Sequence, residues 1–119
     1  MPIVDVELVG EPSPPADLTQ RLADALGEAL RSRPGGTWVR LRLLERSRYA
    51  ENGGVDDDLR PVFVTLLERH RPSGRELVEQ VARVTAAVAE VVGRDPSHVH
   101  VLFEPDAAGR LSFGGRPVE

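Results

Sequence analysis

Alternation of apolar and polar residues predicts four short strands. Over residues 3–9, apolar side chains are separated by Asp5 and Glu7, which is typical of a half-buried strand. The same alternation predicts further strands over residues 38–44, 62–68 and 99–103. Because successive side chains of a strand point to opposite faces of a sheet, each segment presents one apolar row to a core.

Two longer segments repeat their apolar residues at helical spacing. The first predicted helix carries one leucine every four residues, at Leu18, Leu22, Leu26 and Leu30, and it ends before Pro34-Gly35-Gly36. Ser73 and Glu76 have the spacing of a capping box and predict the start of the second helix. The apolar positions of that helix are Leu77, Val81, Val84, Val88 and Val92.

The chain resembles itself when it is shifted by 59 residues. The shift places Pro2 on Pro61, Val4 on Phe63, Leu22 on Val81 and Glu45 on Glu104. Each half then reads as strand, helix, strand. We expect a single domain over residues 1–119, made of two β-α-β repeats at about 2–56 and 60–119, with an acidic connector, residues 46–60, between their regular elements.

Two such repeats predict an α/β (α+β) fold with one four-stranded sheet and both helices on one of its faces. The opposite face would remain uncovered within one chain. Because the predicted strands are strongly apolar, we expect a symmetric oligomer to bury that face.

Composition narrows the chemistry. The 119 residues include no cysteine, which excludes disulfides and thiolate chemistry, and all 15 basic residues are arginine, which excludes a lysine Schiff base. The net charge of −4 and the scattered arginines give no reason to expect nucleic acid as a partner. No apolar stretch predicts a membrane span or a signal peptide, and a cytoplasmic location is expected.

Pro2 is the leading candidate for catalysis. Removal of Met1 would turn its nitrogen into a secondary amine, and we expect this removal because the second residue is small. An α-amino group titrates near pH 8, and nearby cations lower its pKa by disfavouring the charged form. Such an amine can act as a general base near neutral pH. The structural alternative is that proline is simply tolerated at the first position of a strand.

An amino-terminal Met-Pro strand at the head of a duplicated β-α-β unit resembles the tautomerase superfamily, over nearly the whole chain. Residues 38–45 resemble the second strand of 4-oxalocrotonate tautomerase, and residues 61–71 resemble the second-half strand of fused members. Those fused members include malonate semialdehyde decarboxylase and the cis-3-chloroacrylic acid dehalogenases. Residues 111–116 resemble the terminal hairpin of the family, and members of this length are typically trimers.

The resemblance implies a set of site residues around Pro2. Arg69 and Arg71 match an arginine pair that holds the substrate carboxylate, and Arg40 matches a further carboxylate-binding arginine. Tyr49 and Phe113 fall where the family places pocket residues. Each has an alternative: Arg69 and Arg71 as exposed arginines at a turn, Arg40 in an ion pair with the acidic connector, and the two aromatic residues in packing.

The function that follows is a cofactor-independent isomerase or tautomerase. Its substrate would be a small enolisable 2-oxo or 2-hydroxydienoate acid, and the protein would be a homotrimer. Metal binding is not expected, because His98 and His100 share a strand face without a third ligand. Two alternatives stay open: a lyase, in which Glu104 or Asp106 would assist decarboxylation or hydration of a three-carbon acid, and a non-catalytic oligomeric binding protein.

Overall fold

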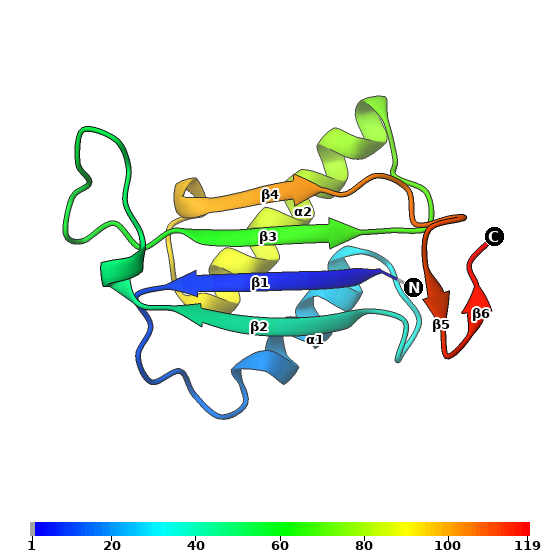
Figure 1. Cartoon of the computed structure of the whole chain (residues 1–119), viewed down its shortest axis with the longest axis horizontal. Helices are drawn as coiled ribbons and strands as arrows, with labels where there is room; N and C mark the ends of the chain where they lie inside the picture. Colours follow the sequence, from blue (N-terminus) through cyan, green and yellow to red (C-terminus); the bar gives the residue numbers. More distant parts are fainter. Residues whose placement is uncertain (1) are drawn as a thin grey trace.

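The computed structural model of the protein describes residues 2–119 (Figure 1). Two β-α-β units follow each other along the chain, and a short hairpin closes it. In chain order the main elements are β1 (Ile3–Val9), α1 (Leu18–Ala29), β2 (Trp38–Leu44), β3 (Val62–Leu67), α2 (Gly74–Val92), β4 (Val99–Phe103), β5 (Ser112–Phe113) and β6 (Arg116–Pro117). Single 3₁₀ turns, η1 (Arg46–Arg48) and η2 (Pro96–His98), follow β2 and precede β4.

The four long strands form one sheet in the order β2-β1-β3-β4. β1 pairs in parallel with β2 and antiparallel with β3, and β3 pairs in parallel with β4. Because β1 and β3 run in opposite directions, Ile3 at the start of β1 lies across from Leu67 at the end of β3. The amino end of β1 and the carboxyl end of β3 therefore lie side by side at the same end of the sheet.

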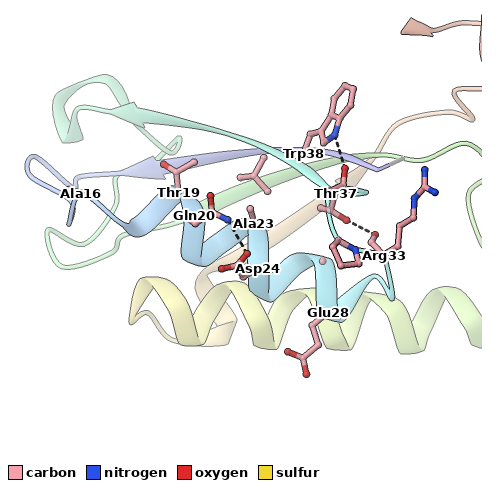
Figure 2. A pocket seen from close by; sticks show the side chains of 14 residues that line it. Ala16, Thr19, Gln20, Ala23, Asp24, Glu28, Arg33, Thr37 and Trp38 are labelled. Atoms are coloured by element: carbon pink, nitrogen blue, oxygen red, sulfur yellow. Dashed lines mark hydrogen bonds between the residues drawn. The ribbon is translucent and has the colours of Figure 1, made fainter. Parts of the chain in front are cut away.

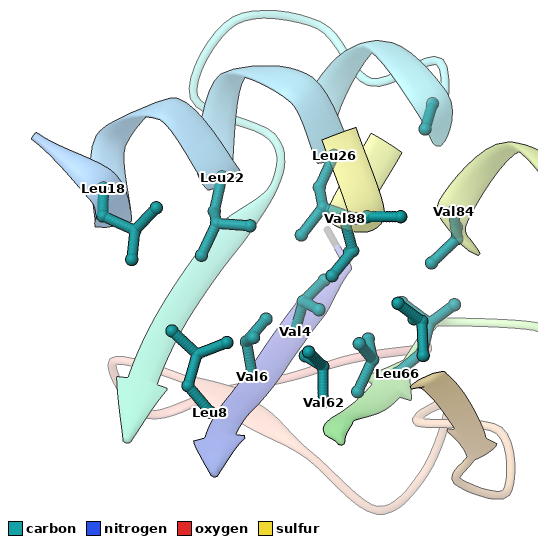
Figure 3. Close-up of a cluster of buried hydrophobic side chains, with 14 residues drawn as sticks. Val4, Val6, Leu8, Leu18, Leu22, Leu26, Val62, Leu66, Val84 and Val88 are labelled. Atoms are coloured by element: carbon teal, nitrogen blue, oxygen red, sulfur yellow. The ribbon is translucent and has the colours of Figure 1, made fainter. Parts of the chain in front are cut away.

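Both helices cover one face of the sheet, as the sequence predicts (Figure 1). Figure 3 shows the leucines of α1 and the valines of α2 above the inward-facing side chains of β1 and β3. Leu22, Leu26, Val84 and Val88 have no exposed surface. Burying side chains of this size stabilises a fold by about 1.5–3 kcal/mol each before entropy costs, which makes this cluster the core.

The repeat is present, but its strand register differs from the 59-residue shift. That shift places Val4, which is buried, on Phe63, which lies on the open face. The residues of β3 that face the helices are Val62, Val64 and Leu66. A slip by one residue moves every side chain to the opposite face, so an odd shift cannot superpose the two strands.

The open face of the sheet is less apolar than the sequence analysis expects. Trp38 and Leu102 are exposed there by 51% and 62%. Between them Asp5 of β1 and Arg40 of β2 lie side by side in an ion pair. The alternation of polar residues therefore gives this face a mixed character. No helix among residues 2–119 is long and apolar enough to cross a membrane.

Two local predictions have different outcomes. The hairpin expected at residues 111–116 is present as β5 paired with β6. The predicted capping box is wrong, because Ser73 precedes α2 with extended backbone but its side chain makes no capping hydrogen bond. Gly74 starts the helix with a positive φ of 61°, which places the first turn out of the geometry that the serine hydroxyl needs.

Candidate active site

Pro2 directly precedes β1, one of the two inner strands of the sheet. Its carbonyl accepts a hydrogen bond from the Trp38 N–H at 3.0 Å, which continues the pairing of β1 with β2, and the residue is half-buried. If the antiparallel register continues by one residue past its last pair, Ile3 and Leu67, Pro2 comes to lie opposite Glu68. The residues that follow β3 are thus brought to the end of the sheet where the chain begins. The expected removal of Met1 concerns a residue outside the described part.

Arg69 and Arg71 follow β3 at this same end. The Arg69 Nε donates a hydrogen bond to the main-chain oxygen of Glu119, and its side chain lines a hollow of about 430 Å³ together with Phe113 and Arg116. The side chain of Arg71 is exposed. Both residues follow the end of β3 that lies beside the amino end of β1, and their role as carboxylate ligands stays a prediction.

Asp106 secures the turn that carries Arg71. Its Oδ1 accepts the Arg71 backbone N–H at 2.8 Å, and its Oδ2 lies 3.4 Å from the His70 Nδ1. The backbone hydrogen bond from Arg71, followed by the contact with His70, lowers the pKa of the Asp106 carboxyl. The loop after β4 is therefore fastened to the loop after β3.

Phe113 and Trp38 form an aromatic wall, a pair of rings in contact near the amino end of β1. Their rings meet edge to face with centroids 4.9 Å apart and an interplanar angle of 67°. The Trp38 Nε1–H donates to the Gly35 carbonyl at 3.1 Å. Sequence reasoning selects Phe113 and misses Trp38, although Trp38 is the single tryptophan and opens a strand that pairs with β1.

Arg40 is engaged by Asp5 within the same chain. Its Nε and Nη2 donate to the two carboxylate oxygens of Asp5 at 2.6 and 2.8 Å. This forked hydrogen bonding raises the pKa of Arg40. Within one chain the partner is therefore Asp5 and not the acidic connector, and an ion pair with the connector of another copy stays a prediction. The pair borders a hollow of about 300 Å³ that also contains Thr65, Glu104 and Arg110.

Tyr49 lies at the other end of the sheet. It follows β2, which runs parallel to β1, so Tyr49 and Pro2 lie at opposite ends. The Tyr49 hydroxyl donates to Glu51, which raises the pKa of the phenol, and its ring packs on Phe63 at 5.8 Å. Within one chain Tyr49 therefore does not join the residues around Pro2.

Glu68 and Gln80 form a polar pair between the end of β3 and α2. Sequence reasoning misses this pair. The Gln80 Nε2 donates to Glu68 Oε1 at 2.8 Å. Burial raises the pKa of the Glu68 carboxyl, and the Gln80 hydrogen bond partly offsets this effect. The second oxygen of Glu68 and the side-chain oxygen of Gln80 are buried, and neither has a hydrogen-bond donor among residues 2–119.

A further hollow lies along α1 and the edge strand β2 (Figure 2). This open groove of about 950 Å³ is lined by residues of α1 and of the turn before β2, including Asp24, Glu28 and Arg33. Trp38 lines this groove, and its backbone N–H donates to the Pro2 carbonyl. Among residues 2–119, no three His, Asp or Glu side chains come together as metal ligands.

Comparison with known proteins identifies the fold. No protein-family model matches the sequence, and no curated protein does. Solved structures match over nearly the whole chain, with TM-scores of about 0.7. A fused 4-OT, solved as a wild-type symmetric trimer, has a TM-score of 0.73 at 16% identity and covers 95% of this chain and 92% of its own.

Two further structures widen the comparison. The macrophage migration inhibitory factor of Oncomelania hupensis has a TM-score of 0.74 at 21% identity, covering 100% of this chain and 83% of its own. FG41 malonate semialdehyde decarboxylase, solved with the inhibitor 3-bromopropiolate, has a TM-score of 0.69 at 19% identity, covering 94% and 88%. The chain therefore has the tautomerase fold, and its structural neighbours include members of the tautomerase superfamily with different activities.

Proposed function

We propose that the protein is a cofactor-independent tautomerase in which the Pro2 amine, freed by removal of Met1, acts as a general base. Its substrate is a small enolisable 2-oxo or 2-hydroxydienoate carboxylic acid. One observation carries the proposal: Pro2 heads the central strand, and antiparallel pairing brings the loop with Arg69 and Arg71 to the same end of the sheet.

The arginines have two effects on the proposed reaction. A guanidinium group binds a carboxylate through forked hydrogen bonds, which orients the substrate. The same positive charge disfavours a protonated amine nearby and so lowers the pKa of Pro2. Arg71, whose side chain is exposed, and Arg69, which borders the hollow with Phe113, are the proposed carboxylate ligands.

In the proposed reaction, the same amine takes up the proton and returns it. The neutral Pro2 nitrogen takes a proton from one substrate position, leaving a dienolate whose negative charge an arginine stabilises. The protonated amine then returns that proton to a different carbon. The reaction needs no oxidant or reductant, because substrate and product are isomers. Phe113 would contact the carbon chain of the substrate from the wall that it forms with Trp38.

Arg40 and Tyr49 have secondary parts in this proposal. A substrate carboxylate at Arg40 would compete with Asp5, which already accepts two hydrogen bonds from it. Tyr49 would contribute to a pocket only from another copy of the chain, since it lies at the far end of the sheet from Pro2. We propose a homotrimer, which the symmetric trimer of the fused 4-OT supports. The cytoplasmic location stays a prediction.

A lyase acting in the same pocket is the second candidate. The neighbour that is a malonate semialdehyde decarboxylase, solved with a three-carbon acid, supports this alternative. Asp106 and Glu68 also supply carboxylates at the Pro2 end, near the two arginines. A non-catalytic binding protein with the same fold is the third possibility, and activity measurements separate all three.

The test is turnover of phenylenolpyruvate and 2-hydroxymuconate by protein whose amino terminus at Pro2 has been verified by mass spectrometry. We expect ketonisation well above the buffer rate. A Pro2→Ala variant keeps a primary amine but loses the rigid ring that positions it, so it should be slower by up to about 10²–10⁴-fold, the usual contribution of a positioned general base. Decarboxylation of malonate semialdehyde without ketonisation would favour the lyase. Failure of every substrate with correctly processed protein would leave the binding role.

A further inference from the structure

The polar pair of Glu68 and Gln80 is unusual for its position. Gln80 projects from the apolar side of α2, between that helix and the sheet, and keeps only 7% of its surface exposed. Glu68 lies directly after β3 on the same side as Val64 and Leu66, as its hydrogen bond to Gln80 requires. A buried carboxylate costs free energy unless hydrogen bonds or charges compensate for its lost hydration.

The hydrogen bonding of this pair is incomplete in a specific way. The Gln80 amide N–H satisfies one oxygen of Glu68. The other oxygen of Glu68 and the amide oxygen of Gln80 are both buried acceptors that lack a donor among residues 2–119. Buried polar atoms in folded proteins nearly always have a hydrogen-bond partner, so two neighbouring acceptors without one indicate a missing donor.

The amine of the mature chain is the donor that this site lacks. Continued by one residue past the pair of Ile3 and Leu67, the register brings Pro2 opposite Glu68. A protonated proline amine carries two N–H groups, which matches the two acceptors that lack a donor. We propose that Glu68, held by Gln80, accepts a hydrogen bond from the Pro2 amine and thereby orients it and favours its protonated form. Glu68 is then a positioning residue for the proposed base.

Other charges act on the same end of the sheet. The positive charges disfavour a protonated amine, whereas the carboxylates favour it. The basic residues near this end of the sheet are Arg69, His70 and Arg71, which follow β3. The acidic residues are Glu76 on the first turn of α2, Asp106 after β4, and Glu119 at the end of the chain. Glu68 differs from the other acids because it has a buried oxygen without a donor.

This difference permits a matched test. Glu68→Gln and Glu76→Gln each remove one negative charge near Pro2, but only the first changes the proposed hydrogen-bond acceptor. The pKa of the amine is measured by NMR titration of protein labelled with ¹⁵N-proline and verified to begin at Pro2. We expect Glu68→Gln to lower the pKa of Pro2 by about one pH unit or more, as loss of an adjacent opposite charge does, and Glu76→Gln to have a much smaller effect.

Two further variants protect the test against misfolding. Glu68→Asp keeps the charge on a shorter arm, and Gln80→Leu removes the group that holds the carboxylate; both should lower the pKa of Pro2 by less than Glu68→Gln. Thermal melting identifies the variants that are folded. If the Pro2 pKa in folded Glu68 variants equals the wild-type value, or if Glu76→Gln lowers it equally, the proposal is wrong.

The inference rests on the proposed free amine of Pro2, but its test does not depend on turnover. A Pro2 pKa that follows Glu68 in a protein that converts no substrate would overturn the proposed function and keep this inference. Turnover that depends on Pro2 together with an amine pKa that ignores Glu68 would do the opposite.

Discussion

Charges of both signs surround the residue on which the proposed chemistry depends. Arg69 and Arg71 stand at the end of β3 and would lower the pKa of Pro2, while the Glu68 carboxylate would raise it. A base is most useful when its pKa lies near the working pH. The sum of these opposing effects therefore decides whether Pro2 begins a catalytic cycle neutral or protonated.

Replacement of Arg71 by glutamine should weaken use of the substrate. Loss of a charge-assisted hydrogen bond to a carboxylate costs about 1.5–3 kcal/mol, so kcat/KM should fall by about 10- to 100-fold. The pKa of Pro2 should rise at the same time, because a nearby positive charge has been removed. Steady-state kinetics with 2-hydroxymuconate measures the first effect, and NMR titration measures the second.

The control for this variant is Arg48→Gln, which removes an exposed arginine at the opposite end of the sheet. It should leave both quantities nearly unchanged. Equal losses in the two variants would show that net charge, rather than binding at Arg71, controls the reaction.

The sequence predicts the place of a single residue best when that residue directly follows a predicted strand. The roles of Arg69 and Arg71, which the family resemblance implies, stay a prediction; the structure shows that both follow the end of β3 that lies beside the start of β1. Glu68 and Gln80 were missed, although a signal was present: both are polar residues that continue the buried rows of β3 and α2. Periodicity identifies apolar rows, and an interruption by a polar residue is easily dismissed as the end of a row.

At the scale of elements, one carboxylate connects the loops that form the rim of the site. Asp106, after β4, accepts the backbone N–H of Arg71, after β3. This backbone hydrogen bond, with a smaller contribution from His70, lowers the pKa of Asp106 in the folded protein. A carboxyl whose pKa is lowered by folding stabilises the fold above its unfolded pKa, and this stabilisation is lost as the pH falls through the lowered value.

An Asp106→Ala variant should accordingly be less stable than the wild type at pH 7. The difference should shrink as the pH is lowered below about 4, the usual pKa of an aspartate, because the wild-type carboxyl then becomes protonated. Urea unfolding at a series of pH values measures this. Asp58→Ala, which changes an exposed residue of the connector, is the matched control. A difference that does not depend on pH would contradict the role of the charge.

The long elements could be predicted well, because each has a clear period. The strands and both helices lie within a few residues of their predicted bounds. The errors come from features without a period. The capping box failed because Gly74 changes the backbone at the start of α2, and the repeat shift failed in the strands because it counted similar residue types without testing which face they occupy.

At the scale of the whole molecule, one face of the sheet is covered by neither helix. Trp38 and Leu102 are large and exposed on it, and the Asp5–Arg40 pair lies between β1 and β2. A trimer that covers this face would bury the apolar side chains and bring residues of different copies together. Such an assembly is the route by which Tyr49 of one copy would reach a pocket of another.

Leu102→Arg should therefore dissociate the proposed trimer. The variant places a positive charge, which is costly to bury, on the open face of β4. Sedimentation velocity should give a trimer for the wild type and smaller species for the variant. Val78→Arg on α2, where the valine is exposed by 69%, should remain a trimer. A wild-type monomer, or a Leu102→Arg trimer, would contradict this assembly.

The proposed reaction depends most on Pro2 as the base, and one comparison tests this directly. The pH dependence of kcat/KM for 2-hydroxymuconate should contain an ionisation with the pKa that NMR gives for the Pro2 amine. Because the neutral amine is the base, activity should rise with pH through that value, and Glu68→Gln should shift the kinetic and NMR values downward together. A kinetic pKa that differs from that of Pro2, or that stays in place when the amine pKa moves, would contradict the account.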